Sequence, residues 1–106
     1  MMEVITVEEA LRLEKQEKVL ILDLRPPESY RQFHIDKAVS YSLDKIENGE
    51  YYLPKDYCII LYCERGGLSL IGARILSHDG FCAKTVIGGM QAYREYRKKN
   101  GLTEKG

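Results

Sequence analysis

The sequence has no excess of either charge, because 16 lysine and arginine residues balance 16 aspartate and glutamate residues. A chain that is neutral overall has no bulk attraction to nucleic acid or to an anionic membrane, so we expect neither as a partner. It also lacks an apolar run long enough to cross a bilayer, and its first residues lack the basic region and long apolar core of a signal peptide. These absences predict a cytoplasmic protein.

Cysteine is scarce as well, and its count bears on the redox compartment. The three cysteines, Cys58, Cys63 and Cys82, are an odd number without paired spacing. This pattern favours a reducing compartment over a disulfide framework. The chain also has no internal repeat, linker or low-complexity segment, and its 106 residues are 44% hydrophobic. We therefore expect one domain over residues 1–106.

Strand-like and helix-like segments alternate along the chain. Short apolar or alternating runs predict strands at residues 19–22, 38–43, 57–62 and 84–87. Capping and spacing signals predict helices from Thr6 to near Gln16, from Pro27 to Phe33, from Leu68 to near His78, and over residues 90–99. Glu9 is the expected capping-box partner of Thr6. The alternation predicts an α/β sandwich around a parallel sheet.

Cys63 follows the most apolar of these predicted strands directly. Gly66 and Gly67 come next, before residues at helical spacing begin at Leu68. Backbone N–H groups and the positive end of a helix dipole meet at such a place, and both favour an anion, including a thiolate. We therefore predict that Cys63 is a catalytic nucleophile. The residues predicted to surround a bound anion are Glu64, Arg65, Gly66, Gly67, Leu68 and Ser69.

The alternative for Cys63 is a buried structural thiol, which is how most free cysteines behave. The glycines and the charged neighbours Glu64 and Arg65 favour the reactive interpretation. Cys58 lies inside the apolar strand and Cys82 in the approach to the last strand, so we expect both to be packing residues. Cysteine-based phosphatases and related arsenate reductases carry an arginine six positions after the cysteine, where this chain has Ser69, so phosphate ester hydrolysis is disfavoured.

Asp23 and Arg25 end another predicted strand, at the edge of the sheet where α/β proteins place their ligands. They either brace the Cys63 loop or serve a local role, with Asp23 bonding backbone N–H groups and Arg25 pairing with Glu28. The local role is favoured because carboxylates beside such turns commonly act as caps. His34 is either a general base or the donor of a structural hydrogen bond, and we favour the second.

A basic run closes the last predicted helix. It suggests either an anionic partner or a solvated helix end that complements the dipole, and we favour the second. The Gly88–Gly89 pair before that helix predicts a tight turn. The residues of the run are Arg94, Arg97, Lys98 and Lys99.

Taken together, the motifs resemble those of single-domain rhodanese-family sulfurtransferases, in the same order and over nearly the whole chain. The matching segments are residues 22–26 with Glu28 and Tyr30, residues 33–35 with 38–39, residues 61–63 with Gly66 and Ser69, residues 73–76 with 80–81, and residues 86–90 with 92–93. The resemblance implies a three-layer rhodanese-like sandwich with a central parallel sheet of four to five strands. Many relatives have a basic residue at the position of Leu68, and Arg65 is the candidate replacement.

The resemblance also implies a ping-pong reaction that needs no metal or organic cofactor. Cys63 would take sulfane sulfur from thiosulfate or a persulfide, and the resulting persulfide would pass it to cyanide, a thiol or a protein acceptor. Loop N–H groups would hold the thiolate and the persulfide alike. Two alternatives remain open. One is a non-catalytic rhodanese-like module that binds partners, and the other is a persulfide carrier that has a dedicated protein partner.

Overall fold

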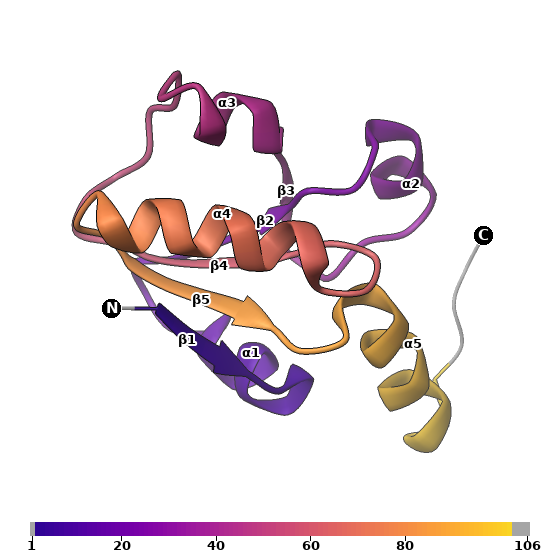
Figure 1. Cartoon of the computed structure of the whole chain (residues 1–106). Coiled ribbons are helices and arrows are strands. Elements are labelled where there is room, and N and C mark those ends of the chain that lie inside the picture. The colour runs from indigo at the N-terminus through magenta and orange to yellow at the C-terminus, as the bar shows by residue number, and fades with distance from the viewer. Residues whose placement is uncertain (1, 103–106) are drawn as a thin grey trace.

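Five parallel strands form one sheet in the order β1-β5-β4-β2-β3, in a computed structural model that describes residues 2–102. The strands are β1 (Met2–Ile5), β2 (Val19–Asp23), β3 (Val39–Ser40), β4 (Cys58–Tyr62) and β5 (Cys82–Val86). The helices are α1 (Val7–Leu13), α2 (Pro27–Gln32), α3 (Leu43–Glu47), α4 (Gly67–His78) and α5 (Gly89–Lys99) (Figure 1). The predicted α/β class with a parallel sheet of four to five strands is confirmed.

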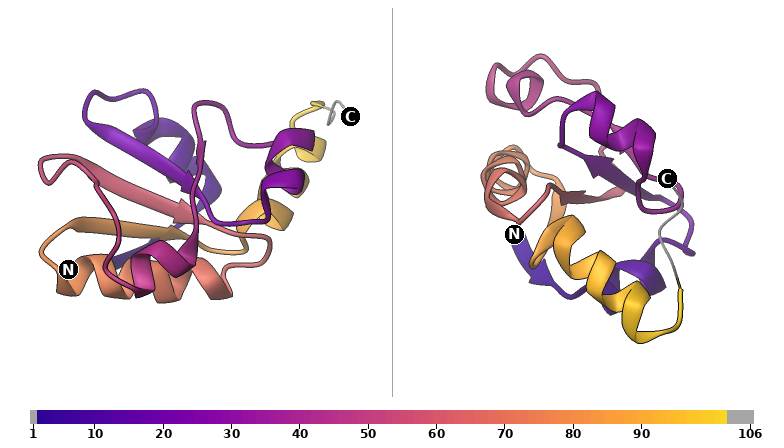
Figure 2. Two further views of the ribbon diagram at one scale, coloured as in Figure 1. Left: turned by 90° about the horizontal axis from the view of Figure 1, so that it is seen from above. Right: turned by 90° about the vertical axis from the view of Figure 1, so that its right-hand side faces the viewer.

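Helices cover both faces of the sheet because parallel strands need crossover connections (Figure 2). On the face of α3 and α4, the core contains Ile59 and Leu61. On the face of α1 and α5, it contains Ile60 and Tyr62 from the same strand. The apolar run over β4 is therefore buried on both sides, as its composition predicted. Among the described residues no helix is long and apolar enough to span a bilayer.

Three segments differ from the sequence-based expectations. The strand expected over residues 38–43 is limited to β3, because the Ser42 hydroxyl accepts a hydrogen bond from the Asp44 N–H and starts α3, which was not predicted. β1 was also missed, since it is a short edge strand whose Glu3 and Val4 are exposed. Helix α1 has the predicted Thr6 capping box but ends at Leu13, before the expected end near Gln16.

The strand register brings the segments that follow β2, β4 and β5 to one edge of the sheet. Asp23, the last residue of β2, pairs with Tyr62, the last residue of β4. Leu61 of β4 pairs with Thr85 of β5. This carboxyl edge, which we define as the strand ends at Asp23, Tyr62 and Val86 with the loops after them, is where α/β sheets hold their ligands. The Cys63 loop emerges from its middle strand.

Candidate active site

The Cys63 side chain lies at the carboxyl edge and is almost completely buried, with the residue 3% exposed. Its Sγ accepts a hydrogen bond from the Gly66 N–H at 3.1 Å. Gly66 is the N-cap of α4 and has φ +107°, in the left-handed region that glycine adopts readily. One of the loop N–H groups expected to hold an anionic sulfur, that of Gly66, is therefore aimed at Sγ.

Ser69, in the first turn of α4, adds a hydroxyl beside the sulfur. Its Oγ lies 3.6 Å from Cys63 Sγ and accepts a hydrogen bond from Thr85 Oγ1 at 2.8 Å. The Ser69 hydroxyl donates to the Gly66 carbonyl at 3.2 Å. Because a hydroxyl hydrogen rotates freely, the same group has the reach to donate to an anionic sulfur instead. Ser69 is one of the predicted anion-binding residues, but the sequence did not predict the contribution of Thr85 from the neighbouring strand.

The first turn of α5 holds the backbone of the same loop. The Met90 N–H donates to the Cys63 carbonyl at 2.8 Å, and the Gln91 N–H donates to the Glu64 carbonyl at 3.1 Å. This contact requires Gly89, because a Cβ there would lie 2.2 Å from the Cys63 carbonyl oxygen. The Gly88–Gly89 pair forms the predicted turn, with positive φ at both residues. The turn places the Met90 and Gln91 N–H groups on two loop carbonyls, whose partial negative charge would otherwise oppose a bound anion.

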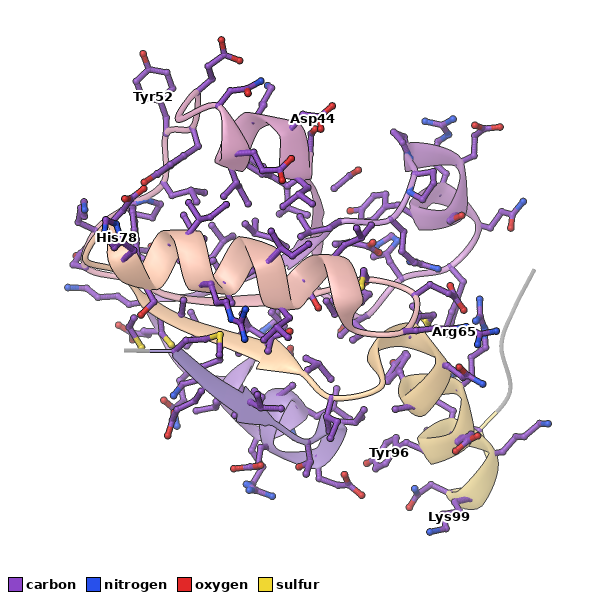
Figure 3. The ribbon with its side chains drawn as sticks, viewed as in Figure 1. Asp44, Tyr52, Arg65, His78, Tyr96 and Lys99 are labelled. Carbon is purple, nitrogen blue, oxygen red and sulfur yellow. The ribbon has the colours of Figure 1, made fainter. Side chains whose placement is uncertain are left out.

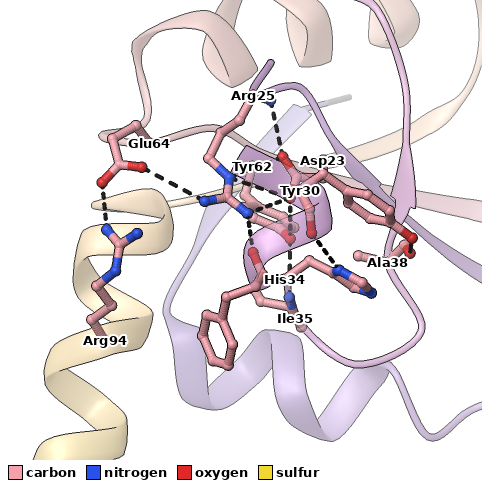
Figure 4. Close-up of polar contacts among 10 residues, drawn as sticks. Asp23, Arg25, Tyr30, His34, Ile35, Ala38, Tyr62, Glu64 and Arg94 are labelled. Carbon is pink, nitrogen blue, oxygen red and sulfur yellow. Dashed lines mark hydrogen bonds and ion pairs between the residues drawn. The ribbon is translucent and has the colours of Figure 1, made fainter. Parts of the chain in front are cut away.

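A buried polar network lies next to this loop and joins β2 to β4 (Figure 4). Asp23 and Arg25, 0% and 4% exposed, form an ion pair with Arg25 Nη2 2.8 Å from Asp23 Oδ2. Asp23 also accepts from the Arg25 backbone N–H at 2.9 Å and from the Tyr62 hydroxyl at 2.6 Å. The Tyr62 oxygen in turn accepts from the Ile35 N–H at 3.0 Å. Each buried polar group thus has a partner, which burial demands.

The charges of this network are fixed by their neighbours. Burial alone would lower the pKa of Arg25, but the hydrogen bond and the negative charge of Asp23 outweigh it and raise that pKa. Burial and the same carboxylate raise the pKa of Tyr62. Tyr62 was not among the predicted site residues, although a tyrosine at the end of an apolar run needs a partner for its hydroxyl, which indicates such a network.

Arg25 does not pair with Glu28 as the local interpretation expected, because the Asp23 carboxylate and the Phe33 carbonyl occupy its guanidinium. Its Nη1 lies 3.8 Å from Glu64 Oε1, so Arg25 reaches the Cys63 loop. Of the local role, the part of Asp23 is present, because it accepts a hydrogen bond from the Arg25 backbone N–H, but the Arg25–Glu28 pair is wrong. Arg25 instead contacts Glu64 of the Cys63 loop.

Glu64 is held mainly by α5, where Arg94 Nη1 lies 2.6 Å from its Oε2 (Figure 4). Arg94 was assigned to a solvated helix end, and this contact corrects that prediction for Arg94. Arg65, by contrast, is exposed at the loop end of α4, opposite the end that carries His78 (Figure 3). Within the described residues Arg65 makes no hydrogen bond or ion pair, and Leu68 is 47% exposed.

His34 has the structural hydrogen bond that the sequence favoured. Its Nδ1 lies 2.7 Å from the Tyr30 carbonyl oxygen, and its ring stacks on the Tyr30 ring with centroids 3.8 Å apart. Cys82 is exposed and Cys58 is half-buried, so the packing role expected of Cys82 is wrong. Both lie at the first residues of their strands, at the other end of β4 and β5 from the Cys63 loop.

Comparison with known proteins identifies one family over most of the chain. Residues 6–96 match the family model described as "Rhodanese-like domain". The chain is 37% identical over 75 residues to a tRNA sulfurtransferase of Desulfurococcus amylolyticus, which covers 71% of this chain but only 15% of that protein. It is 29% identical over 89 residues to the thiosulfate sulfurtransferase GlpE of Coxiella burnetii, which covers 83% of each chain.

A solved structure shows the same fold. The rhodanese homolog TT1651 of Thermus thermophilus superposes with a TM-score of 0.69 and is 34% identical, covering 87% of this chain and 99% of its own. The three-layer rhodanese-like architecture implied by the sequence motifs is therefore confirmed.

Proposed function

This chain belongs to the rhodanese-like domain family, and on that premise we propose that it is a sulfurtransferase that carries sulfane sulfur as a persulfide on Cys63. The names of its relatives support sulfur transfer in general. The observation that carries the assignment to Cys63 is the Gly66 N–H, 3.1 Å from Sγ at the start of α4. A donor at this place stabilises an anionic sulfur, both in the thiolate that attacks and in the persulfide that results.

The reaction balances without a redox partner or a cofactor. The Cys63 thiolate attacks the outer sulfur of thiosulfate, the S–S bond of the donor breaks, and sulfite leaves with the bonding electron pair. An acceptor thiolate or cyanide then attacks the outer sulfur of the persulfide and regenerates the Cys63 thiolate. Ser69 Oγ, 3.6 Å from Sγ, is placed to donate to the anion between the two steps.

The proposed donor is thiosulfate or a small persulfide. Arg65 supports an anionic donor because it is an exposed cation in the loop with no ion-pair partner among residues 2–102. Leu68 favours a second candidate, a carrier loaded by a protein partner, because this half-exposed apolar side chain stands where many relatives have a charge. It also lines a cavity of about 500 Å³ together with Leu24 and Pro26.

Intact mass after incubation with thiosulfate tests the proposal, using the wild type, Cys63→Ser and Cys58→Ser. We expect a gain of one sulfur, about 32 Da, on the wild type and on Cys58→Ser but not on Cys63→Ser. Cyanide should then remove the added sulfur and release thiocyanate. Arg65→Ala should raise KM for thiosulfate and leave the loss of persulfide to cyanide unchanged.

The contrary results separate the rival functions. A gain on Cys63→Ser would assign the nucleophile to another cysteine. No gain with thiosulfate but a gain with glutathione persulfide would favour the carrier. No gain with either donor would contradict the transferase and favour a binding module.

A further inference from the structure

Cys58 and Cys82 face each other across two neighbouring strands. They are the first residues of β4 and β5, and the register pairs their Cα positions directly. Their Sγ atoms lie 2.7 Å apart. Because β4 and β5 run toward the Cys63 loop, both residues lie at the amino edge of the sheet, which we define as the first residues of β4 and β5 (Figure 1).

The sheet geometry suits a covalent link between these two residues. Side chains alternate along a strand, so Cys58 shares a face with Ile60, and Cys82 shares that face with Lys84. Neighbouring strands lie about 4.8 Å apart, within the range of Cα separations that a disulfide spans. A bond of about 2.05 Å requires the sulfurs to approach by only about 0.7 Å from their present separation.

The two thiols also differ in a way that suits an exchange reaction. Cys82 is exposed and open to a reagent, whereas Cys58 is half-buried. Burial and the contact with Cys82 raise the pKa of Cys58 to about 12, so Cys82 is the better first nucleophile. Lys84, two residues farther along the same face, brings a positive charge that offsets part of the rise in the pKa of Cys58, and it is paired with Glu3 of β1.

We propose that Cys58 and Cys82 form a redox-modification site, a reversible intrachain disulfide made by exchange with a low-molecular-weight disulfide such as oxidised glutathione. The Cys82 thiolate attacks one glutathione sulfur, and the first glutathione leaves as a thiolate. The Cys58 thiolate then attacks Cys82 Sγ and displaces the second. The protein loses two hydrogens and two electrons, and the glutathione disulfide takes them up as two thiols.

This bond would enclose the active-site loop within a covalent ring. The segment between Cys58 and Cys82 contains Cys63, its loop and the whole of α4. Closing that segment restricts the unfolded chain and therefore stabilises the folded one. Cys63 itself lies at the opposite edge of the sheet, so its sulfur takes no part in this disulfide.

The test uses a Cys63→Ser background, because one tryptic peptide, residues 56–65, contains both Cys58 and Cys63. Oxidised glutathione should lower the intact mass by about 2 Da and link the peptide of residues 56–65 to that of residues 75–84. Dithiothreitol should reverse both changes. The oxidised form should melt about 10 °C higher than the reduced form.

Matched variants decide the assignment. Cys58→Ser and Cys82→Ser, each in the Cys63→Ser background, should show neither the mass loss nor the rise in Tm. A stable glutathione adduct on Cys82, a disulfide-linked dimer or an unchanged mass in the parent variant would overturn the proposal. Cys58→Ser in the otherwise natural chain should keep its transferase activity, because it lies outside the Cys63 site.

Discussion

Cys58 is the first residue of β4, and Cys63 directly follows Tyr62, the last residue of that strand. One strand therefore separates two thiols at opposite edges of the sheet. Cys63 is buried, and its sulfur contacts the Gly66 N–H and the Ser69 hydroxyl. Cys58 is half-buried, and its sulfur contacts the sulfur of Cys82. A cysteine thiol thus lies beside groups that can donate hydrogen bonds to an anion at one edge, and beside a second thiol with which it can form a disulfide at the other. Its neighbours, more than its sequence position in an apolar run, determine its chemistry.

Two ion pairs of the sheet also differ in how far they are removed from water. The carboxyl edge contains the Asp23–Arg25 pair, which is removed from water and shared with Tyr62. The Glu3–Lys84 pair joins the middle of β5 to β1, and its side chains are 60% and 18% exposed, respectively. A buried charge without its partner is costly, whereas an exposed pair contributes little. We therefore expect the fold to depend more on the Asp23–Arg25 pair than on the Glu3–Lys84 pair.

The largest expected effect is on the free energy of unfolding, when the two ion pairs are broken one at a time. Asp23→Asn leaves the buried Arg25 charge without its carboxylate and should lower the free energy of unfolding by about 3–5 kcal/mol. Glu3→Gln, the matched change in the pair between β1 and β5, should lower it by less than about 1 kcal/mol. Urea unfolding of both variants measures the difference, and equal losses would contradict the contrast.

Two glycines with positive φ give the next largest effect. Gly89→Ala places a Cβ against the carbonyl of Cys63 and should cost about 2–4 kcal/mol of stability, with loss of sulfur transfer. Gly80→Ala, before β5, has φ +96° and meets only the flexible Lys55 ammonium, so it should cost about 1–2 kcal/mol. Thermal melts and activity assays of the two variants test whether Gly89→Ala is the more damaging change. Similar activity in both would show that the backbone of the Cys63 loop tolerates the displacement.

A serine at each end of α4 provides a smaller, catalytic contrast. Ser69→Ala removes a hydroxyl near Cys63 Sγ and should slow sulfur transfer about tenfold, the effect of one hydrogen bond to an anion. Ser77→Ala, near the other end of α4, should leave the rate unchanged. The readout is kcat with each acceptor. A rate for Ser69→Ala within error of the wild type would remove the hydroxyl from the mechanism.

The smallest expected effect concerns the charge of Glu64. Glu64→Gln removes a carboxylate from the Cys63 loop, and with it the negative charge that lies 2.6 Å from Arg94 Nη1 and 3.8 Å from Arg25 Nη1. KM for thiosulfate should fall about two- to fivefold at low salt, and the gain should vanish near 1 M salt. Glu3→Gln serves as the control with no expected change. A salt-independent gain would point to a change in loop conformation instead.

Local patterns in the sequence predicted the elements that depend on neighbouring residues. The Thr6–Glu9 capping box, the buried run over β4 and the turn at Gly88–Gly89 each depend on a few adjacent side chains or on backbone freedom. The placement of Cys63 at the start of α4 follows from the same logic. These features were accordingly expected with nearly correct boundaries.

Contacts between distant segments were not predictable in this way. Glu64 and Arg94 are 30 positions apart, and Asp23 and Tyr62 are 39 apart, so their pairing depends on the order of the strands. The Cys58–Cys82 contact depends on the register of β4 and β5, which neither strand specifies alone. β1 was not predicted because an edge strand has only one partner and little burial, so its hydrophobic alternation is weak.

The position of β1 beside β5 has a consequence for synthesis on the ribosome. β1 pairs with β5 alone, and about 80 residues of chain separate the two strands. At usual translation rates β1 therefore leaves the ribosome about 4–16 s before its partner exists. Until then the strand has no sheet to join, and the order of assembly is set by the later strands. Both partners of β2, namely β3 and β4, are synthesised before β5, so those pairs can form while β1 still lacks its partner.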